Sequence, residues 1–444
     1  MENGKRAQWG SNFGFIMAAA GSAVGLGNLW KFPYLAGKNG GGVFVLIYLL
    51  IVLFIGFTIM LGEMAIGRST QLSSYNAYRK INKKWSYVGA IGVIAGFIIL
   101  SFYSVVGGWV LNYLYQTVIG GIPADTGAYF ESFISDPLAP IFWAMVFMIA
   151  TAIIVFKGIG GGIEKACKFM MPALFVILVI ISIRAMTLPG AGAGIAFYLT
   201  PDFSKLTAGT IVAALGQVFF SLSLGMGCII TYGSYLGKEE NLEKNSIIVP
   251  FLDTLVALLA GFAILPAVFA FGFEPGSGPG LMFITLPQVF DKMPLGWVFG
   301  TLFFLLVLFA ALTSSISLLE VTVAYMQDHH KWGRTKAVIV LSLLMFLISI
   351  PASLSMGILS NVQILGNNLF DFLVLISDIL LPLGGLLMCI FIGYVWGMDK
   401  AVAEITNGGK FPFKLKGFWT IMIKYIAPLA VIVVFLNALG ILKL

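Results

Sequence analysis

Acidic residues inside hydrophobic segments are the first positions of this sequence that could do chemistry. Five stand in such segments: Glu63, Asp253, Glu320, Asp371 and Asp378. A charge in apolar surroundings is costly and needs a partner. We interpret Glu63, Glu320 and Asp378 as hydrogen-bonded structural acids. Asp253 has no basic residue near it in the sequence, so a bound cation is its predicted partner.

Glycine-rich stretches interrupt two of the hydrophobic segments. One is Ala20–Asn28 (AGSAVGLGN) and the other is Ser221–Gly227 (SLSLGMG). Close packing between helices explains either stretch taken alone. Their corresponding positions in two halves of the chain instead predict two broken helices around a binding site. A broken helix exposes amide groups that attract a carboxylate and carbonyl groups that attract a cation.

Hydroxyl side chains form the third polar group, Thr313-Ser314-Ser315, in another hydrophobic segment. Such hydroxyls often donate only to the preceding helical turn. Oxygen atoms are also the ligands that a hard cation requires. Both interpretations stay open at this point.

The segments that carry these residues predict an all-α integral membrane protein. The chain has 444 residues, of which 59% are hydrophobic and 10% are charged. Runs of 18 or more apolar residues are typical of helices that cross a bilayer, so the lipid bilayer is a predicted partner. Eleven spans are predicted, at residues 12–36, 42–67, 88–120, 138–156, 169–188, 208–236, 245–271, 295–326, 337–356, 367–396 and 417–442.

Lysine and arginine residues predict the orientation, because short cytoplasmic loops are enriched in them. They gather before the first span and in every second loop, as in Arg79-Lys80 and Lys83-Lys84. This places the amino terminus in the cytoplasm and, with eleven spans, the carboxyl terminus outside, in the inner (plasma) membrane. Most of the lysine and arginine residues behind the net charge of +7 lie in these short loops, so no nucleic-acid partner is expected.

Few residues suit a membrane enzyme or a structural metal. The cysteines Cys167, Cys228 and Cys389 are scattered, which argues against a disulfide framework or a zinc site. The histidines His329 and His330 are adjacent in a loop, and the buried acids lack an intramembrane protease motif. We therefore expect no enzyme. A channel is disfavoured because paired helix breaks indicate a closed central site.

At these residues the sequence resembles the neurotransmitter:sodium symporter family. The matching motifs are Gly21–Pro33, Gly40–Gly42, Gly62–Arg68, Gln217–Ser223 and Leu312–Ser315, and the resemblance covers nearly the whole chain. It implies the leucine-transporter fold, with eleven transmembrane helices, a 5+5 inverted repeat and discontinuous helices 1 and 6. The eleven-span bacterial transporters of tyrosine and other hydrophobic amino acids are the most similar members.

The family organisation implies a single membrane domain over residues 1–444. The first repeat would cover helices 1–5 at 12–188 and the second would cover helices 6–10 at 208–396. Residues 417–442 would form helix 11. The sequence leaves open whether the chain forms a homodimer.

The resemblance also implies two sodium sites and an amino acid site. The first sodium site would use Ala23, Asn28, Ser221 and Asp253, completed by the substrate carboxylate, and the second would use Gly21, Val24, Ala310, Thr313 and Ser314. The substrate carboxylate would meet Leu26, Gly27 and Tyr103, and the ammonium would meet Ala23, Phe220, Ser221 and Ser223. The substrate side chain would contact Ser22, Ile99, Phe220, Met226, Ser314 and Leu318.

Gates are implied on both sides of this site. Tyr103 and Phe220 would form an aromatic lid, and the cytoplasmic gate would consist of Arg6, Trp9 and Asp328. On the extracellular side Lys31 replaces the usual arginine. Its acidic partner is in doubt, since Val374 or Leu373 stands at that position and Asp371 is a substitute one turn away.

These features predict a sodium-coupled symporter of large hydrophobic or aromatic L-amino acids, such as tyrosine, tryptophan or leucine. Met226 favours bulky substrates because a thioether packs around varied shapes. Chloride independence is expected because Asp253 supplies a negative charge beside Tyr48, Gln217 and Ser221, which resemble the anion-site positions of animal relatives. The alternative is a sodium-independent amino acid exchanger of the same fold.

Overall fold

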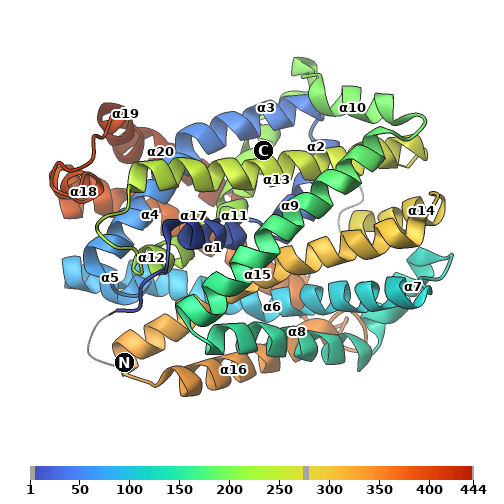
Figure 1. The fold of residues 1–444 in the computed structure, drawn as a ribbon, viewed down its shortest axis with the longest axis horizontal. Coiled ribbons are helices and arrows are strands. Elements are labelled where there is room, and N and C mark those ends of the chain that lie inside the picture. The colour runs from blue at the N-terminus through green and yellow to red at the C-terminus, as the bar shows by residue number, and fades with distance from the viewer. Residues whose placement is uncertain (1–5, 274–279, 443–444) are drawn as a thin grey trace.

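The computed structural model describes residues 6–273 and 280–442, and most of them are helical (Figure 1). Within these ranges, nine helical segments are long and apolar enough to cross a membrane. Six of them centre on one α-helix: α6 (Ser86–Ile119), α8 (Ala139–Phe156), α9 (Lys165–Met186), α13 (Leu242–Ala270), α15 (Gly296–His330) and α16 (Arg334–Leu354). Three consist of two helices joined by a π-helical turn: α3 (Gly42–Ile51) with α4 (Phe57–Thr70), α17 (Leu369–Ile390) with α18 (Met398–Ile405), and α19 (Lys416–Ile421) with α20 (Ala427–Ala438).

Two further spans are broken at the predicted glycine-rich stretches. The first consists of α1 (Asn12–Ala23), a π-helical turn at Gly27–Lys31 and α2 (Phe32–Lys38), with a bend of 52° at the break. The second consists of α11 (Ala208–Ser221) and α12 (Cys228–Gly233). Each half of this second span is too short to cross a bilayer alone. With the nine segments above, the broken pairs account for the eleven predicted spans.

Backbone geometry explains why the second break needs glycine. Ser223, Gly225 and Gly227 have positive φ angles of 54°, 77° and 75°, which glycine adopts at little cost. A Cβ atom on Gly225 would also lie 2.2 Å from the carbonyl oxygen of Leu381. At the first break, Val24 is extended with ψ of 109°, and this ends α1.

The broken helix α1 lies in the middle of the bundle, where it contacts α9, α13 and α15 (Figure 1). Short elements lie at the two ends of the long helices. They are α5 (Ser74–Ile81), α7 (Thr126–Ser135), α10 (Ala191–Leu199), α14 (Leu286–Asp291) and an antiparallel pair, β1 (Gln363–Ile364) and β2 (Asn367–Asn368), in which Gln363 faces Asn368. The breaks therefore lie at the depth where a substrate can be enclosed by helices on all sides.

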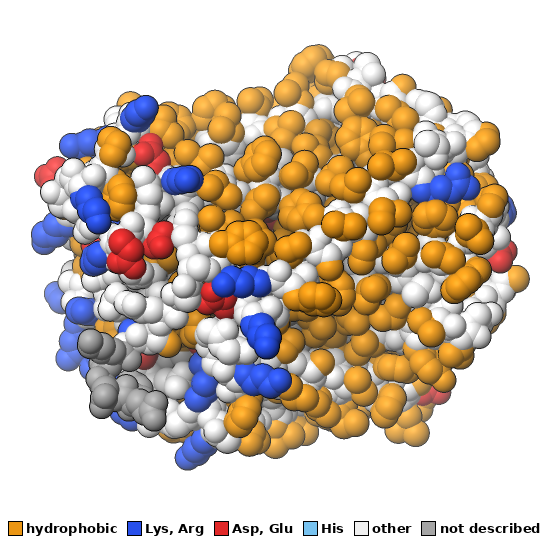
Figure 2. Space-filling view, viewed as in Figure 1, with side chains coloured by type: hydrophobic (Ala, Val, Ile, Leu, Met, Phe, Trp, Pro, Cys, Tyr) orange, Lys and Arg blue, Asp and Glu red, His pale blue; other side chains and the backbone are white. Residues whose placement is uncertain are grey.

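The surface separates into a hydrophobic belt and a basic end (Figure 2). Exposed apolar side chains such as Val176, Phe251 and Leu343 cover the helices between the ends. We call the side of α5, α12 and α18 the basic end, because lysine and arginine gather there (Figures 1 and 2). The side of α7, α10 and α14 is the opposite end. This distribution is that of a multi-pass membrane protein.

Candidate functional site

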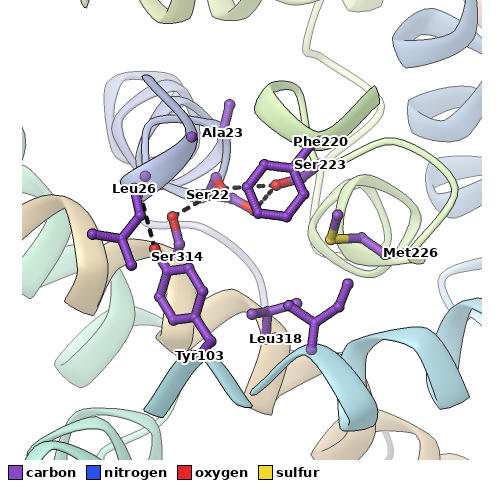
Figure 3. Close-up of a pocket in the computed structure, with 12 residues that line it drawn as sticks. Ser22, Ala23, Leu26, Tyr103, Phe220, Ser223, Met226, Ser314 and Leu318 are labelled. Atoms are coloured by element: carbon purple, nitrogen blue, oxygen red, sulfur yellow. Dashed lines mark hydrogen bonds between the residues drawn. The ribbon is translucent and has the colours of Figure 1, made fainter. Parts of the chain in front are cut away.

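A pocket lies between the two breaks (Figure 3). Four parts of the fold form its walls: α1 with its break, α6, the α11–α12 link and α15. The lining residues are Ser22, Ala23, Gly25, Leu26, Gly27, Ile99, Tyr103, Phe220, Ser223, Met226, Ser314 and Leu318. The structure thus brings together all of the predicted substrate residues except Ser221, which lies outside this lining.

One side of the pocket is polar. The hydroxyl of Tyr103 accepts a hydrogen bond from the amide of Leu26 at 3.2 Å. The hydroxyl of Ser223 donates to the carbonyl of Ser22 at 2.7 Å, and this bond joins the two breaks (Figure 3). In a continuous helix the backbone amide and carbonyl groups would be hydrogen-bonded to one another. At the breaks they are available, so this side suits a charged group of a ligand.

The other side of the pocket is apolar. Met226 and Leu318 lie on it, away from the hydroxyl groups of Ser22 and Ser223 (Figure 3), and Ile99 also lines the pocket. Phe220 lies between the two sides, and its ring packs close to Gly27, where a Cβ atom would be 2.8 Å from the ring. A molecule with a zwitterionic head and an apolar tail matches this division.

Gly25 also lines the pocket, although the sequence analysis did not place it in the site. A Cβ atom there would lie 2.5 Å from the hydroxyl oxygen of Ser314 and 3.0 Å from that of Tyr103. Ser317 was missed as well, and it accepts a hydrogen bond from the Ser22 hydroxyl at 2.7 Å. The spacing of Gly21 and Gly25 could have indicated Gly25. No local pattern in the sequence marks Ser317.

Asp253 lies in a fully buried polar cluster beside the pocket. Its carboxylate accepts hydrogen bonds from the Asn28 amide at 2.8 Å and from the Ser221 hydroxyl at 2.8 Å. Tyr48 contributes a longer bond of 3.4 Å. Ala23 of the same predicted sodium site lines the neighbouring pocket.

The oxygen atoms of this cluster are suitable ligands for a cation. No basic side chain pairs with Asp253 among the described residues. Nearby, Gln217 donates to the Gly27 carbonyl at 2.9 Å, and its own buried oxygen has no partner within the described part of the chain. Buried carboxylate, hydroxyl and amide oxygens without a balancing charge are suitable ligands for a hard cation such as Na⁺.

A second oxygen-rich cluster joins α15 to the break after α1. The Ser314 hydroxyl lies 3.5 Å from the carbonyl of Gly21, 3.3 Å from that of Ser22 and 3.1 Å from that of Val24. The Ser22 carbonyl already accepts the Ser223 hydroxyl, but the single Ser314 proton cannot satisfy the carbonyls of both Gly21 and Val24, and this surplus of oxygen atoms fits a cation.

Thr313 and Ala310 lie in the same region of α15. The Thr313 hydroxyl donates back to the carbonyls of Phe309 and Ala310 at 3.0 Å each, as the local interpretation predicts. The Thr313 side chain also packs on Gly21, where a Cβ atom would approach to 3.0 Å. All five residues of the predicted second site therefore lie at this contact.

Arg6 makes a set of contacts at the basic end that we call the basic-end latch. Its guanidinium contacts both carboxylate oxygens of Asp328, at 2.6 and 2.7 Å, and donates to Ser234 at 2.8 Å. Asp328 also accepts the Ser73 amide at 2.6 Å. Trp9 donates to the Tyr232 carbonyl at 3.0 Å.

The opposite end has a different arrangement. The ammonium of Lys31 lies 4.9 Å from the centre of the Phe220 ring, and no salt bridge to Lys31 occurs in the described ranges. Asp371 does not reach it: this acid is exposed and bonds to Asn368 at the start of α17. Val374 lines a cavity on this side of the pocket.

The remaining buried acids divide into two kinds. Glu63 accepts the Gly225 amide at 2.7 Å, and Glu320 accepts the Tyr235 hydroxyl at 2.7 Å and pairs with Arg334 at 2.5 Å. Both are hydrogen-bonded structural acids, as predicted. Asp378 is not, because no described residue donates a hydrogen bond to it. Its side chain instead lines open cavities.

Comparison with known proteins gives consistent results. The family model "Sodium:neurotransmitter symporter family" matches residues 6–133 and 127–443. The uncharacterized sodium-dependent transporter YhdH of Bacillus subtilis (strain 168) is 42% identical, over the full length of both chains. An uncharacterized sodium-dependent transporter of Haemophilus influenzae is 40% identical over 98% of this chain and 99% of that one.

A solved structure has the same fold. The crystal structure of MhsT in complex with L-phenylalanine superposes with a TM-score of 0.91 and is 45% identical, covering 98% of this chain and 100% of that one. The fold class, with its broken helices, is therefore confirmed, whereas the predicted repeat boundaries stay predictions. The matched names are those of transporters and not of enzymes. On the family model and these identities, the chain belongs to the sodium:neurotransmitter symporter family.

Proposed function

We propose that this protein is a sodium-coupled symporter for large hydrophobic or aromatic L-amino acids and that it works by alternating access without chloride. The observation that carries the proposal is the pocket between the two helix breaks, with one polar and one apolar side. The MhsT structure is a complex with L-phenylalanine, and this ligand supports the same substrate class.

Each part of the pocket would then have a role. The amides of Leu26 and Gly27 and the Tyr103 hydroxyl would bind the substrate carboxylate. The carbonyls of Ala23, Phe220 and Ser221, with the Ser223 hydroxyl, would bind the ammonium. Ile99, Met226 and Leu318 would contact the side chain, and apolar walls discriminate by only about 1–3 kcal/mol per methylene. We therefore expect several bulky amino acids to compete for the site.

Two sodium ions would bind with the substrate. The first would lie among Ala23, Asn28, Ser221 and Asp253 and would also contact the substrate carboxylate, so that ion and amino acid bind together. In the present structure the Asn28 oxygen accepts the Gly25 amide at 3.0 Å and its nitrogen faces Asp253. A turn of this amide would present the oxygen instead. The second ion would bridge Gly21, Val24, Ala310, Thr313 and Ser314 and would hold α1 against α15.

The orientation belongs to the same proposal. The basic end would face the cytoplasm, because positive loops stay on that side of the inner membrane. The opposite end would admit substrate from outside. A sodium-independent exchanger is the alternative function, but the hydroxyls of Thr313 and Ser314 that a second sodium site needs are both present.

Uptake by proteoliposomes tests the proposal. An inward Na⁺ gradient should drive accumulation of labelled phenylalanine, tyrosine, tryptophan or leucine, and K⁺ in its place should not. Thr313→Ala combined with Ser314→Ala should abolish sodium-driven accumulation, whereas Thr301→Ala, at a half-buried threonine of the same helix outside the proposed sites, should leave it unchanged. Equal uptake without Na⁺ would establish the exchanger, and binding of glycine or glutamate alone would refute the substrate class.

Chloride independence is tested at Asp253. Its carboxylate supplies a permanent negative charge that balances the bound cations, which are costly in a low dielectric. Asp253→Ser should lose activity in chloride-free buffer and regain part of it when chloride is added, while the parent should be indifferent. Loss of parent uptake on chloride removal would contradict this role.

A further inference from the structure

Three buried hydroxyl groups meet at the polar side of the central pocket. Ser22, near the end of α1, and Ser223, in the second break, line the pocket (Figure 3). Ser317 lies on α15 outside the lining. The exposed fractions of Ser22, Ser223 and Ser317 are 2%, 4% and 1%, so bulk water does not reach them. Their hydrogen bonds must therefore be made within the protein or with a ligand.

Each of these hydroxyls directs its proton into the protein. Ser317 donates to the carbonyl of Ser314 at 2.8 Å, and Ser223 donates to the carbonyl of Ser22 at 2.7 Å. The Ser22 hydroxyl donates to the Ser317 oxygen at 2.7 Å, with the Ser223 oxygen as a longer alternative at 3.2 Å. A hydroxyl has one proton and two lone pairs. Ser22 and Ser223 therefore present lone pairs to the pocket and no free proton.

The oxygen of Ser317 decides where the Ser22 proton points. Without this oxygen, the Ser22 hydroxyl would turn its proton toward Ser223, where it would occupy a lone pair, or toward the pocket itself. The buried Cys228 thiol lies within hydrogen-bonding reach of Ser317 and Ser22. Sulfur is a weak acceptor, so it does not replace the Ser317 oxygen, and its one weak donor leaves Ser22 a second lone pair.

A positively charged group with several donors fits the oxygens of Ser22 and Ser223. These two oxygens are 3.2 Å apart, so a single ammonium group can contact both. An ammonium has three N–H donors and no acceptor, and its hydrogen bonds are stronger than those between neutral groups. A hydroxyl proton aimed into the pocket would repel the same group.

We propose that Ser317 is a positioning residue for substrate recognition: it holds the Ser22 hydroxyl as an acceptor, and Ser22 then binds the substrate ammonium together with Ser223. The resemblance to the symporter family implied only a side-chain contact for Ser22 and no role for Ser317. This inference rests on the proposed function, because it adds a ligand for the amino group to the same pocket.

Binding of labelled L-phenylalanine in Na⁺ tests whether Ser317 acts through Ser22. Ser22→Ala should raise Kd roughly tenfold, the loss expected for one hydrogen bond to a charged group, and Ser317→Ala roughly three- to tenfold. The double variant should bind no more weakly than Ser22→Ala, because the second change removes the support of a hydroxyl that is already absent. Thr322→Val is the matched control, since this buried hydroxyl on the same helix donates to Leu319 at 2.8 Å and does not line the pocket.

Two further measurements separate recognition of the amino group from a general effect on packing. L-phenyllactate carries a hydroxyl in place of the ammonium, so its inhibition constant should be equal in the parent and in Ser317→Ala. Binding of radioactive Na⁺ without an amino acid should also be equal. A merely structural effect of Ser317 on Ser314, whose carbonyl it contacts, would instead disturb the proposed second sodium site.

The outcomes separate this inference from the proposed function. Parent-like affinity of Ser317→Ala for phenylalanine, additive losses in the double variant, or an equal loss of phenyllactate or sodium binding would each overturn the positioning role while the symporter function stands. Absence of sodium-dependent amino acid binding in the parent would refute the proposed function, and this inference would fall with it.

Discussion

The two ends of the molecule are sealed in different ways around the same pocket. At the basic end, charged side chains pair directly: Arg6 with Asp328 at 2.6 Å, Arg68 with Glu404 at 2.7 Å and Lys238 with Glu404 at 2.5 Å. At the opposite end, two cavities are lined by Phe220. One of them, which we call the vestibule, shares Leu26, Gly27, Tyr103 and Phe220 with the central pocket.

This difference indicates which barrier holds the present conformation. On the opposite side, the residues between the pocket and the vestibule are Leu26, Gly27, Tyr103 and Phe220, and none of them forms an ion pair. On the basic side, ion pairs link segments that are hundreds of residues apart in sequence, as with Arg6 and Asp328. A ligand that leaves past an aromatic lid breaks few polar contacts, whereas opening the basic end breaks several charge-assisted hydrogen bonds. Mutations at the basic end should therefore shift the conformational equilibrium most.

Asp328→Ala is expected to have the largest effect. It removes both contacts to Arg6 and the acceptor of the Ser73 amide. Loss of charge-assisted bonds of this kind costs about 2 kcal/mol, which is a roughly 30-fold shift toward the state open at the basic end. Labelling of cysteines from the basic side should increase, and the apparent substrate affinity should fall. Asp399→Ala, an exposed acid at the same end, is the control; an Asp328→Ala protein with unchanged labelling and affinity would show that the latch does not hold this state.

Glu164→Gln should act in the same direction with a smaller effect. The Glu164 carboxylate accepts the Gly10 amide at 2.7 Å and contacts Lys168 at 2.5 Å, so it ties the segment before α1 to α9. Glutamine keeps one acceptor but loses the charge, and we expect a shift of about 1 kcal/mol, or roughly fivefold. Gly14→Ala should mimic it, because a Cβ atom there would lie 2.1 Å from the carboxylate oxygen. Labelling that responds to neither change would limit the seal to Arg6 and Asp328.

The smallest net change is expected when both ends are weakened together. Asp328→Ala is expected to favour opening at the basic end. Lys31→Gln removes the cation over the Phe220 ring and is expected to favour opening at the opposite end, so the two effects on the population ratio should partly cancel. The double variant should lie closer to the parent than Asp328→Ala does when cysteine labelling is compared from both sides. A double variant that labels rapidly from both sides at once would mean that the two ends open independently, and the two seals would then not belong to one equilibrium.

Local sequence patterns were sufficient for most of the fold and for the pocket. Hydrophobic runs predicted the spans because a helix must present apolar side chains to lipid along its whole length. The glycine-rich stretches predicted both breaks because positive φ angles, as at Gly225 and Gly227, favour glycine. The pocket residues were implied by the resemblance to the symporter family, which the motifs at the breaks carry in part.

The partners of charged residues were harder to predict. Asp371, Val374 and Asp378 lie within two turns of one helix, and the sequence does not say which of them faces Lys31. Asp371 was a candidate by spacing, yet in the structure it bonds to Asn368 at the helix start. Asp378 was interpreted as a hydrogen-bonded structural acid, but it lines the cavities instead. Helix rotation and packing decide such contacts, and these depend on the whole bundle.

The sequence by itself therefore determined that this chain crosses the membrane, where its helices break and which residue types surround the breaks. These properties follow from the local cost of burying polar groups and from the backbone freedom of glycine. Only the tertiary structure decided which segments the ion pairs of the basic end join, such as Arg68 with Glu404, and that Lys31 lies over the Phe220 ring. Such contacts join residues far apart in the chain, and they form only when packing has set the position and rotation of every helix.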